Sequence, residues 1–310
     1  MKKKKFYLKL FISIVILCLL FYTIDLEVCL KTLARVDLKT FLTIVFIYIT
    51  GQIISAKKWE VISKQLGFDI KLSQYIKYYF KGMFYNTFLP TNVGGDIMKV
   101  TYICKDKGVE PSIVSVLSDR LSGVAVLIIL ALAGSLIITT NSFIRTSIFA
   151  LALAMFLSVA FGIYICRKNL DFNKEILKKC INYGKAFLNK SLIEIFILSL
   201  IFHILVLIIH VLIGNAIGLN INFLYYLVLY PLTAIAASFP ISLNGIGIKE
   251  AAYVYLLKLV EIEPSQAIVF VLIWNLVVLA SSLLGILGFI PQKSLIDFAK
   301  NVTIIKKEEN

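Results

Sequence analysis

Long apolar stretches, separated by shorter polar ones, dominate this chain. A helix that crosses a membrane needs about 20 mostly apolar residues, and several stretches approach or exceed that length. The stretch Ile195–Ile248 contains no charged residue and is far longer than one span, and glycines and asparagines divide it. The pattern predicts an all-α polytopic membrane protein with about seven transmembrane helices, drawn from Phe6–Ile24, Thr40–Ala56, Leu121–Ile144, Thr146–Cys166, Ile195–Ile248 and Pro264–Gln292.

Composition supports this class. Hydrophobic residues make up 59% of the chain and charged residues only 16%, whereas a soluble domain carries about 25% charged residues. The first apolar stretch follows a run of lysines, as in a signal peptide, but no small-residue cleavage site precedes Asp25. We therefore expect an uncleaved anchor helix, a single membrane domain over residues 1–292 and a basic cytoplasmic tail over residues 293–310.

The pattern of cysteines and histidines gives no sign of a metal or cofactor site. The five cysteines are scattered and form no CxxC motif, so a disulfide framework or a zinc site is not expected. His203 and His210 lie two helical turns apart, about 10 Å, which is too far for one metal ion without other ligands. We expect them to make polar contacts inside the helix bundle. No nucleotide-binding loop, catalytic triad or HExxH motif is present.

The net charge of +14 reflects topology rather than nucleic-acid binding. Most of the 32 Lys and Arg residues fall in the N-terminal arm, in residues 57–81, 99–107 and 167–190, and in the tail. Basic residues gather on the cytoplasmic side of membrane proteins, so both termini are predicted to be cytoplasmic. The loops on the other side hold few basic residues, namely Lys31, Arg35, Lys39, Arg145 and Lys258.

This orientation requires two segments to enter the membrane and return to the same side. Ser73–Thr101 lies between two basic stretches, and Asn222–Val260 has to begin and end on the opposite side. Each segment has an apolar arm, a break rich in Pro, Gly and Asn, and a short second arm. We therefore expect two opposed re-entrant hairpins and a possible inverted repeat, an arrangement that places substrate sites near the midplane.

The two breaks resemble each other. Residues 89–99 read LPTNVGGDIMK, and residues 239–250 read FPISLNGIGIKE. Proline ends a helical arm, and glycine permits positive φ and close backbone approach. Irregular backbone at membrane depth is tolerated only against protein or a water-filled cavity, and the N–H groups of a restarting helix attract anions. We therefore expect the breaks to bind a phosphate headgroup.

Ionisable residues beside the breaks are functional candidates by default. Asp96 is placed to N-cap the helix after the first break, where it would repel phosphate unless it were protonated or paired with Lys99, Arg120 or Lys249. Proton or ion coupling is a further alternative for Asp96. The predicted substrate-binding residues are Pro90, Asn92, Gly94, Gly95, Asp96, Lys99, Asp119, Arg120, Pro240, Asn244, Gly245, Gly247, Lys249 and Glu250.

The two breaks and the Asp119–Arg120 pair between them resemble the lysylphosphatidylglycerol synthase transmembrane, or flippase-like, family, from about Lys5 to Pro291. Where the family usually has an arginine after Gly-Gly-Asp, this chain has Lys99, which keeps the charge but loses the bidentate fork. The resemblance implies a membrane part that moves lipids between leaflets. In multiple-peptide-resistance proteins this part is joined to a soluble domain that transfers lysine from lysyl-tRNA to phosphatidylglycerol.

These observations leave three hypotheses about function. The first is translocation of an anionic phospholipid or lipid-linked substrate between leaflets. The second is phosphatidylglycerol lysyltransferase activity, on its own or with a separate soluble synthase; the chain ends 18 residues after Gln292, so we expect no room for the soluble domain. The third is a membrane scaffold for an envelope-synthesis enzyme. We expect no cofactor, and no catalytic residue is predicted.

Overall fold

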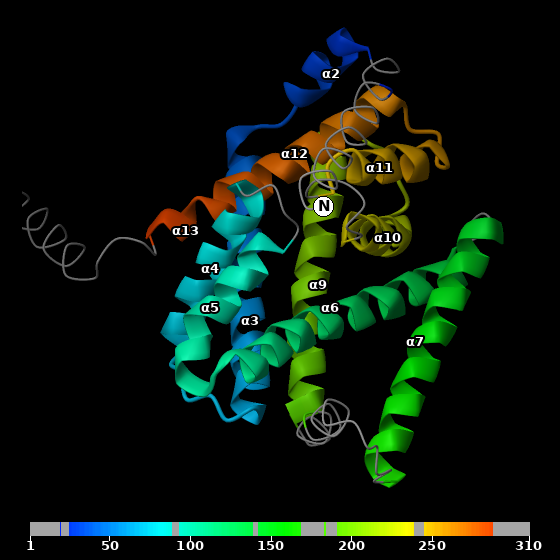
Figure 1. Ribbon diagram of the computed structural model, residues 1–310. Coiled ribbons are helices and arrows are strands. Elements are labelled where there is room, and N and C mark those ends of the chain that lie inside the picture. The colour runs from blue at the N-terminus through cyan, green and yellow to red at the C-terminus, as the bar shows by residue number, and fades with distance from the viewer. Residues whose placement is uncertain are drawn as a thin grey trace, which may run out of the picture.

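The computed structural model describes residue 19, residues 25–88, 93–138, 142–168, residue 183, and residues 191–238 and 245–287. The described part contains helices and turns and no strand. Figure 1 shows the arrangement of these helices. They are α2 (Leu26–Leu33), α3 (Leu38–Gln65), α4 (Leu72–Phe88), α5 (Gly94–Lys107), α6 (Val109–Ile137), α7 (Ser142–Lys168), α9 (Ser191–Ala216), the 3₁₀ turn η1 (Phe223–Tyr225), α10 (Tyr226–Ser238), α11 (Ile248–Lys258), α12 (Pro264–Ser282) and α13 (Leu284–Leu287).

Among the described residues, four helices are long and apolar enough to cross a membrane. They are Leu38–Gln65, Val109–Ile137, Ser191–Ala216 and Pro264–Ile286. The prediction of an all-α polytopic membrane protein is therefore confirmed, and the count of about seven spans stays a prediction. The predicted anchor helix Phe6–Ile24 and the tail over residues 293–310 lie outside the described residues, apart from Leu19 in the anchor.

Small residues allow the spanning helices to approach one another. Lipid tails are as apolar as leucine, so helices in a bilayer associate by close packing rather than by the hydrophobic effect. A Cβ added at Gly51 of α3 would lie 3.2 Å from the Phe202 ring of α9, and one at Gly134 of α6 would lie 2.8 Å from Leu227 of α10. These two glycines therefore set the close contacts of α3 with α9 and of α6 with α10.

Helix α3 begins where the sequence suggests and ends later. The Asp37 carboxylate caps its first turn by accepting the Thr40 N–H at 2.9 Å. The helix continues to Gln65, although the prediction ended it at Ala56 and placed a basic loop from Lys57 onward. The helix therefore extends beyond the predicted span into the basic stretch, and the limits of the span stay a prediction. Glu60 pairs along the helix with Lys57 (2.7 Å) and Lys64 (2.8 Å), so the last turns hold part of the charge of that stretch.

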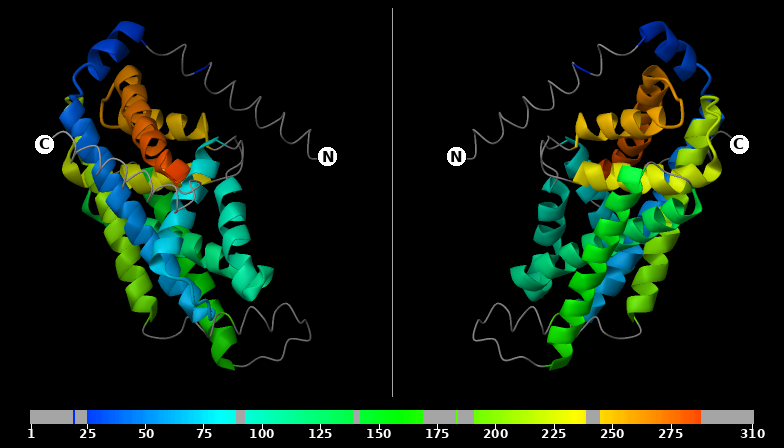
Figure 2. Two further views of the ribbon diagram at one scale, coloured as in Figure 1. Left: turned by 90° about the vertical axis from the view of Figure 1, so that its left-hand side faces the viewer. Right: turned by 90° about the vertical axis from the view of Figure 1, so that its right-hand side faces the viewer.

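Two helix–break–helix segments flank α9. The pair α4–α5 lies on one side of α9 in Figure 1 and the pair α10–α11 on the other. In Figure 2, α10 and α11 run across the direction of α3 and α9. In each segment the two helices pack against each other, while the breaks at residues 89–92 and 239–244 lie outside the described residues. That the segments are re-entrant, and that they form an inverted repeat, stay predictions.

Candidate functional site

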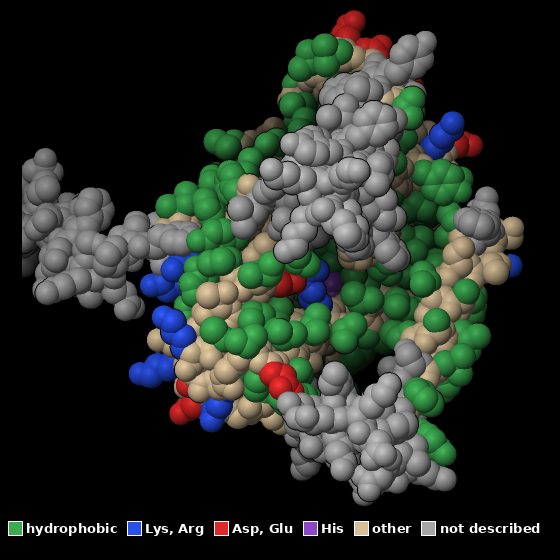
Figure 3. All heavy atoms as spheres, viewed as in Figure 1, with side chains coloured by type: hydrophobic (Ala, Val, Ile, Leu, Met, Phe, Trp, Pro, Cys, Tyr) green, Lys and Arg blue, Asp and Glu red, His purple; other side chains and the backbone are tan. Residues whose placement is uncertain are grey.

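A polar cavity of about 330 Å³ lies between α3, α4, α5, α6 and α9. Figure 3 shows acidic, basic and histidine side chains at the bottom of a recess in a largely apolar face. Charged groups are costly inside a membrane protein, where they face the bundle interior or a water-filled cavity. The cavity is lined by Tyr48, Gln52, Ser55, Lys58, Tyr79, Met83, Asn86, Asp96, Lys99, Asp119, Arg120, Gly123, Val124, Leu127, Phe202 and His203.

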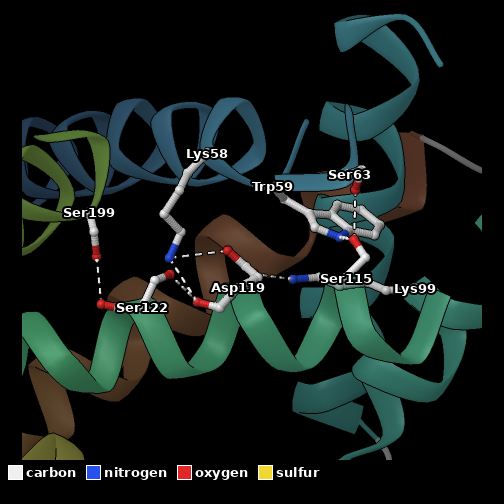
Figure 4. Close-up of polar contacts among 8 residues, drawn as sticks. All are labelled: Lys58, Trp59, Ser63, Lys99, Ser115, Asp119, Ser122 and Ser199. Atoms are coloured by element: carbon white, nitrogen blue, oxygen red, sulfur yellow. Dashed lines mark hydrogen bonds and ion pairs between the residues drawn. The ribbon is translucent and has the colours of Figure 1, made fainter. Parts of the chain in front are cut away.

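The Asp119 carboxylate of α6 joins two lysines from different helices. Lys58 Nζ of α3 lies 3.1 Å from Asp119 Oδ1 and donates to the Asp119 carbonyl oxygen at 2.9 Å. Lys99 Nζ of α5 lies 3.7 Å from Asp119 Oδ2. All three side chains are buried. Figure 4 shows Lys58 pointing from α3 toward Asp119. One carboxylate therefore balances charges from two other helices at the centre of the bundle.

Serines hold α6 in place on both sides of Asp119 (Figure 4). One turn before it, Ser115 Oγ accepts the Trp59 indole N–H at 2.8 Å and lies 2.7 Å from Ser63 Oγ. On the other side, the Ser199 hydroxyl of α9 donates to the Ser122 carbonyl at 3.4 Å. Buried hydrogen bonds of this kind fix one arrangement of helices because their partners would otherwise be left unsatisfied.

Lys99 lies in an aromatic environment as well as beside Asp119. Its Nζ is 3.4 Å from the centroid of the Tyr79 ring and 5.2 Å from that of Trp59. Aromatic faces attract cations, most strongly where water is excluded. These contacts, together with Asp119, explain how a lysine so close to the first break is retained inside the bundle.

The Asp96–Arg120 pair lies at the more exposed edge of the cavity. The two side chains form an ion pair between α5 and α6, with 38% of the Arg120 side chain exposed and 16% of that of Asp96. The predicted N-cap role of Asp96 is wrong: Val93 occupies the N-cap and Asp96 lies within the first turn. The Gly95 N–H is instead taken by Asn86 Oδ1 of α4 at 2.7 Å, so the Asp96 carboxylate is directed to Arg120.

The first break also requires glycine at position 95. A Cβ there would lie 2.1 Å from the Gly82 carbonyl oxygen and 2.7 Å from the Asn86 side chain. Helices α4 and α5 therefore approach backbone to backbone at this point. Gly94 is the first residue of α5; it is also buried and does not line the cavity.

The residues after the second break form a separate cluster. Glu250 Oε2 accepts the Gly247 N–H at 2.6 Å, and Asn275 of α12 donates to Glu250 Oε1 at 3.2 Å. Lys249 donates to the oxygen of the same Asn275 side chain. Gly245 and Gly247 have φ values of 74° and 88°, which glycine adopts without strain. None of these four predicted site residues lines the cavity.

The structure thus brings four of the predicted residues together at one cavity: Asp96, Lys99, Asp119 and Arg120. Pro90, Asn92, Pro240 and Asn244 lie outside the described residues. No group of three or more His, Cys, Asp or Glu residues within the described part of the chain could hold a metal ion.

Several cavity residues were not predicted from the sequence. From the sequence, Lys58 is expected in a basic cytoplasmic stretch, and His203 in polar contacts inside the bundle. His203 does make such a contact, with its Nδ1 2.7 Å from the Tyr230 hydroxyl, but it also lines the cavity. A usable signal existed: Ser55 and Lys58 are three residues apart in a continuous helix, and so share one face. The unpredicted polar residues are Gln52, Ser55, Lys58, Tyr79, Asn86 and His203.

Comparison with known proteins gives one match. The family described as "Lysylphosphatidylglycerol synthase TM region" matches residues 6–285, which is most of the chain and includes both breaks and the cavity. This confirms the resemblance based on the two motifs. No curated protein and no solved structure matches the chain.

Proposed function

The chain belongs to the family of lysylphosphatidylglycerol synthase TM regions, and from this premise and the charged cavity we propose that it translocates an anionic phospholipid or lipid-linked substrate between membrane leaflets. The family relates this membrane protein to the handling of lysylphosphatidylglycerol. The cavity supplies a place inside the bundle where a charged headgroup replaces its contacts with water by contacts with protein.

The main support for the proposal is the net formal charge of the side chains that line the cavity. Its three cationic side chains are Lys58, Lys99 and Arg120, and its two carboxylates are Asp96 and Asp119. The formal balance is one positive charge. A phosphodiester headgroup carries one negative charge, so a single bound lipid neutralises the cavity. An uncompensated charge in a low-dielectric interior is costly, and this balance favours an anionic guest.

The internal ion pairs suit a transporter better than a tight binder. A phosphate oxygen that approaches Lys58 or Lys99 competes with Asp119 for the same cations. Binding is therefore an exchange of one anion for another and stays reversible. A volume of about 330 Å³ is at the small end of ligand pockets, which span about 300–1,000 Å³. This size suits a headgroup whose acyl chains remain in the surrounding lipid.

The proposal includes an orientation in the cell membrane with both termini cytoplasmic. It rests on the concentration of Lys and Arg in the N-terminal arm, in residues 57–81, 99–107 and 167–190, and in the tail, which follows the positive-inside rule. The α4–α5 pair would then enter from the cytoplasmic side and the α10–α11 pair from the other side.

Reconstituted protein tests the proposal directly. Vesicles containing phosphatidylglycerol labelled on an acyl chain are treated with a membrane-impermeant reductant, which bleaches only the outer leaflet. We expect wild-type protein to expose the inner-leaflet label, and Lys99→Gln and Arg120→Gln to slow this exposure at least about tenfold, since each removes a charge-assisted contact. Lys31→Gln is the matched control, because Lys31 is exposed and its ion pair among the described residues is with Glu27 on its own helix.

The same preparation separates translocation from synthesis. If vesicles supplied with lysyl-tRNA form lysylphosphatidylglycerol, the chain has lysyltransferase activity and the second hypothesis replaces the first. If a separate soluble synthase is needed for that product, the chain is a component of the pathway. If Asp96→Asn and Arg120→Ala both leave lipid translocation intact, the assignment of the cavity as the headgroup site is wrong.

A further inference from the structure

His203 of α9 presents an unused polar atom to the deep end of the cavity. It is buried, with 5% of its surface exposed, and it lines the cavity. Its Nδ1 lies 2.7 Å from the Tyr230 hydroxyl of α10. Its Nε2 meets the distance and angle of a hydrogen bond with no described residue, and the Gly123 backbone lies close enough only for a weak interaction with the ring. A buried polar atom without a partner costs free energy, and such an atom in a cavity points to a ligand.

Gly123 keeps the space in front of this atom open. A Cβ added at Gly123 would lie 3.5 Å from His203 Nε2 and 3.9 Å from Lys58 Nζ. Both nitrogens therefore face the same small volume beside α6. Lys58 has three donor hydrogens and uses contacts to the Asp119 carbonyl and carboxylate, which leaves one donor for a guest.

We propose that His203 Nε2 and Lys58 Nζ together bind a phosphoryl oxygen of the substrate in the space left by Gly123. This inference rests on the proposed function and adds to it the group that the deep end of the cavity recognises. If the Tyr230 hydroxyl donates to Nδ1, the proton of the neutral imidazole lies on Nε2, which is then a donor. A cationic guest is disfavoured at this position because Lys58 already places a positive charge there.

Two conservative variants test the site without removing a charge. Gly123→Ala adds a methyl group at ordinary contact distances from its neighbours, and alanine is a better helix former than glycine, so we expect the protein to fold with unchanged or higher stability. The methyl group fills the proposed oxygen position. We expect the affinity for dioctanoyl phosphatidylglycerol to fall at least about tenfold, the loss that follows from removing hydrogen bonds to a charged group. Ser135→Ala on the same helix is the control, since within the described part of the chain the Ser135 hydroxyl bonds the Leu132 carbonyl of its own helix.

The second variant addresses the orientation of the imidazole. Tyr230→Phe removes the hydroxyl that holds Nδ1 and should also weaken binding of dioctanoyl phosphatidylglycerol. Tyr226→Phe is matched to it: it lies on the same helix, is buried, and loses a hydroxyl that has no hydrogen-bond partner among the described residues. Equal affinities of the two variants would contradict the proposed role of Tyr230 in positioning His203.

A direct readout is available because the chain has only two histidines. In protein labelled with ¹⁵N-histidine, the His210→Gln variant assigns the two imidazoles. We expect dioctanoyl phosphatidylglycerol to shift the resonance of the His203 Nε2 that carries the proton of the neutral imidazole. The resonances of His210, which is bonded to Tyr253 and Val206, should not shift. Dioctanoylglycerol, which lacks the phosphate, should cause no shift.

The possible outcomes distinguish a lipid headgroup from free phosphate as the ligand, and they distinguish failure of this inference from failure of the proposed function. A shift with the lipid but not with inorganic phosphate identifies a lipid headgroup, and a shift with inorganic phosphate identifies free phosphate as a sufficient ligand. If the lipid binds and is translocated without shifting the His203 Nε2 resonance, or if dioctanoylglycerol gives the same shift, the inference fails and the proposed function stands. If the lipid neither binds nor moves, both fail.

Discussion

Lys58 and Asp119 are joined by two contacts, from Lys58 Nζ to the Asp119 backbone carbonyl at 2.9 Å and to the carboxylate at 3.1 Å. The contacts connect the C-terminal half of α3 to the N-terminal half of α6. Because the backbone carbonyl takes part, the lysine keeps one partner even when the carboxylate is removed. Because of this asymmetry, we expect substitution of Asp119 and substitution of Lys58 to lower the stability of the protein by different amounts.

We predict that Asp119→Asn destabilises the protein more than Lys58→Met. Asp119 balances Lys58 and Lys99, so its loss leaves two buried cations without a carboxylate. Lys58→Met leaves Asp119 with Lys99. Removing one partner of a buried pair costs about 3–5 kcal/mol, and we expect the asparagine variant to reach that range and the methionine variant to remain below it. Thermal unfolding of detergent-purified protein measures both. The opposite order would show that Asp119 is held mainly by Lys58.

The Arg120–Asp96 pair should matter for transport and little for stability. Much of the Arg120 side chain is exposed, and exposed ion pairs contribute about 0–1 kcal/mol. Asp96→Asn should therefore leave the unfolding temperature nearly unchanged while it alters the rate of phosphatidylglycerol translocation. Glu27→Gln, in an exposed pair with Lys31, is the control for both measurements. A large drop in unfolding temperature for Asp96→Asn alone would assign the pair a structural role instead.

The sequence predicted the class of the fold and four of the cavity's five charged residues, Asp96, Lys99, Asp119 and Arg120, for the same physical reason. Charged residues are conspicuous in apolar stretches, so Asp119 and Arg120 could be identified without a structure. Lys58 was harder to identify, because it follows a span in a run of basic residues that resembles a loop. Its spacing from Ser55 indicates a shared helix face only because α3 continues to Gln65.

Partners across helices were harder to predict than the residues themselves. Lys249 is one of the predicted partners of Asp96, and Glu250 is a predicted residue of the same substrate site, but the structure bonds both to Asn275. Asn275 is a single polar residue in α12, and its sequence context carries no sign of such a contact. The pairing depends on how α11 packs against α12, which local pattern does not determine. The same holds for Asn86, which caps α5 from α4.

Gly95→Ala should disrupt the α4–α5 pair. The added methyl carbon would lie 2.1 Å from the Gly82 carbonyl oxygen, and backbone atoms at such a distance have to move apart. Overpacking of this kind costs about 1–3 kcal/mol and occasionally more. We expect a lower unfolding temperature and a loss of translocation. Thr101→Ala on the same helix is the control, because Thr101 is exposed and, among the residues that the structure describes, its hydroxyl bonds the Ile97 carbonyl of α5. Wild-type behaviour of Gly95→Ala would contradict the close approach at Gly82.

Asn275 should hold the second charged cluster together. Its amide accepts from Lys249 and donates to Glu250, so Asn275→Leu keeps the approximate size of the side chain and removes a partner from each of two ionisable groups. Loss of a hydrogen bond to a charged group costs about 1.5–3 kcal/mol, and we expect a destabilisation of at least this size in thermal unfolding. Ser281→Ala on the same helix is the control: the Ser281 hydroxyl is buried and has no hydrogen-bond partner among the described residues, so its removal should be neutral or stabilising.

Because the cluster does not line the cavity, the affinity for dioctanoyl phosphatidylglycerol should be unchanged at temperatures where Asn275→Leu remains folded. A selective loss of affinity without a loss of stability would instead place the second break at the substrate site.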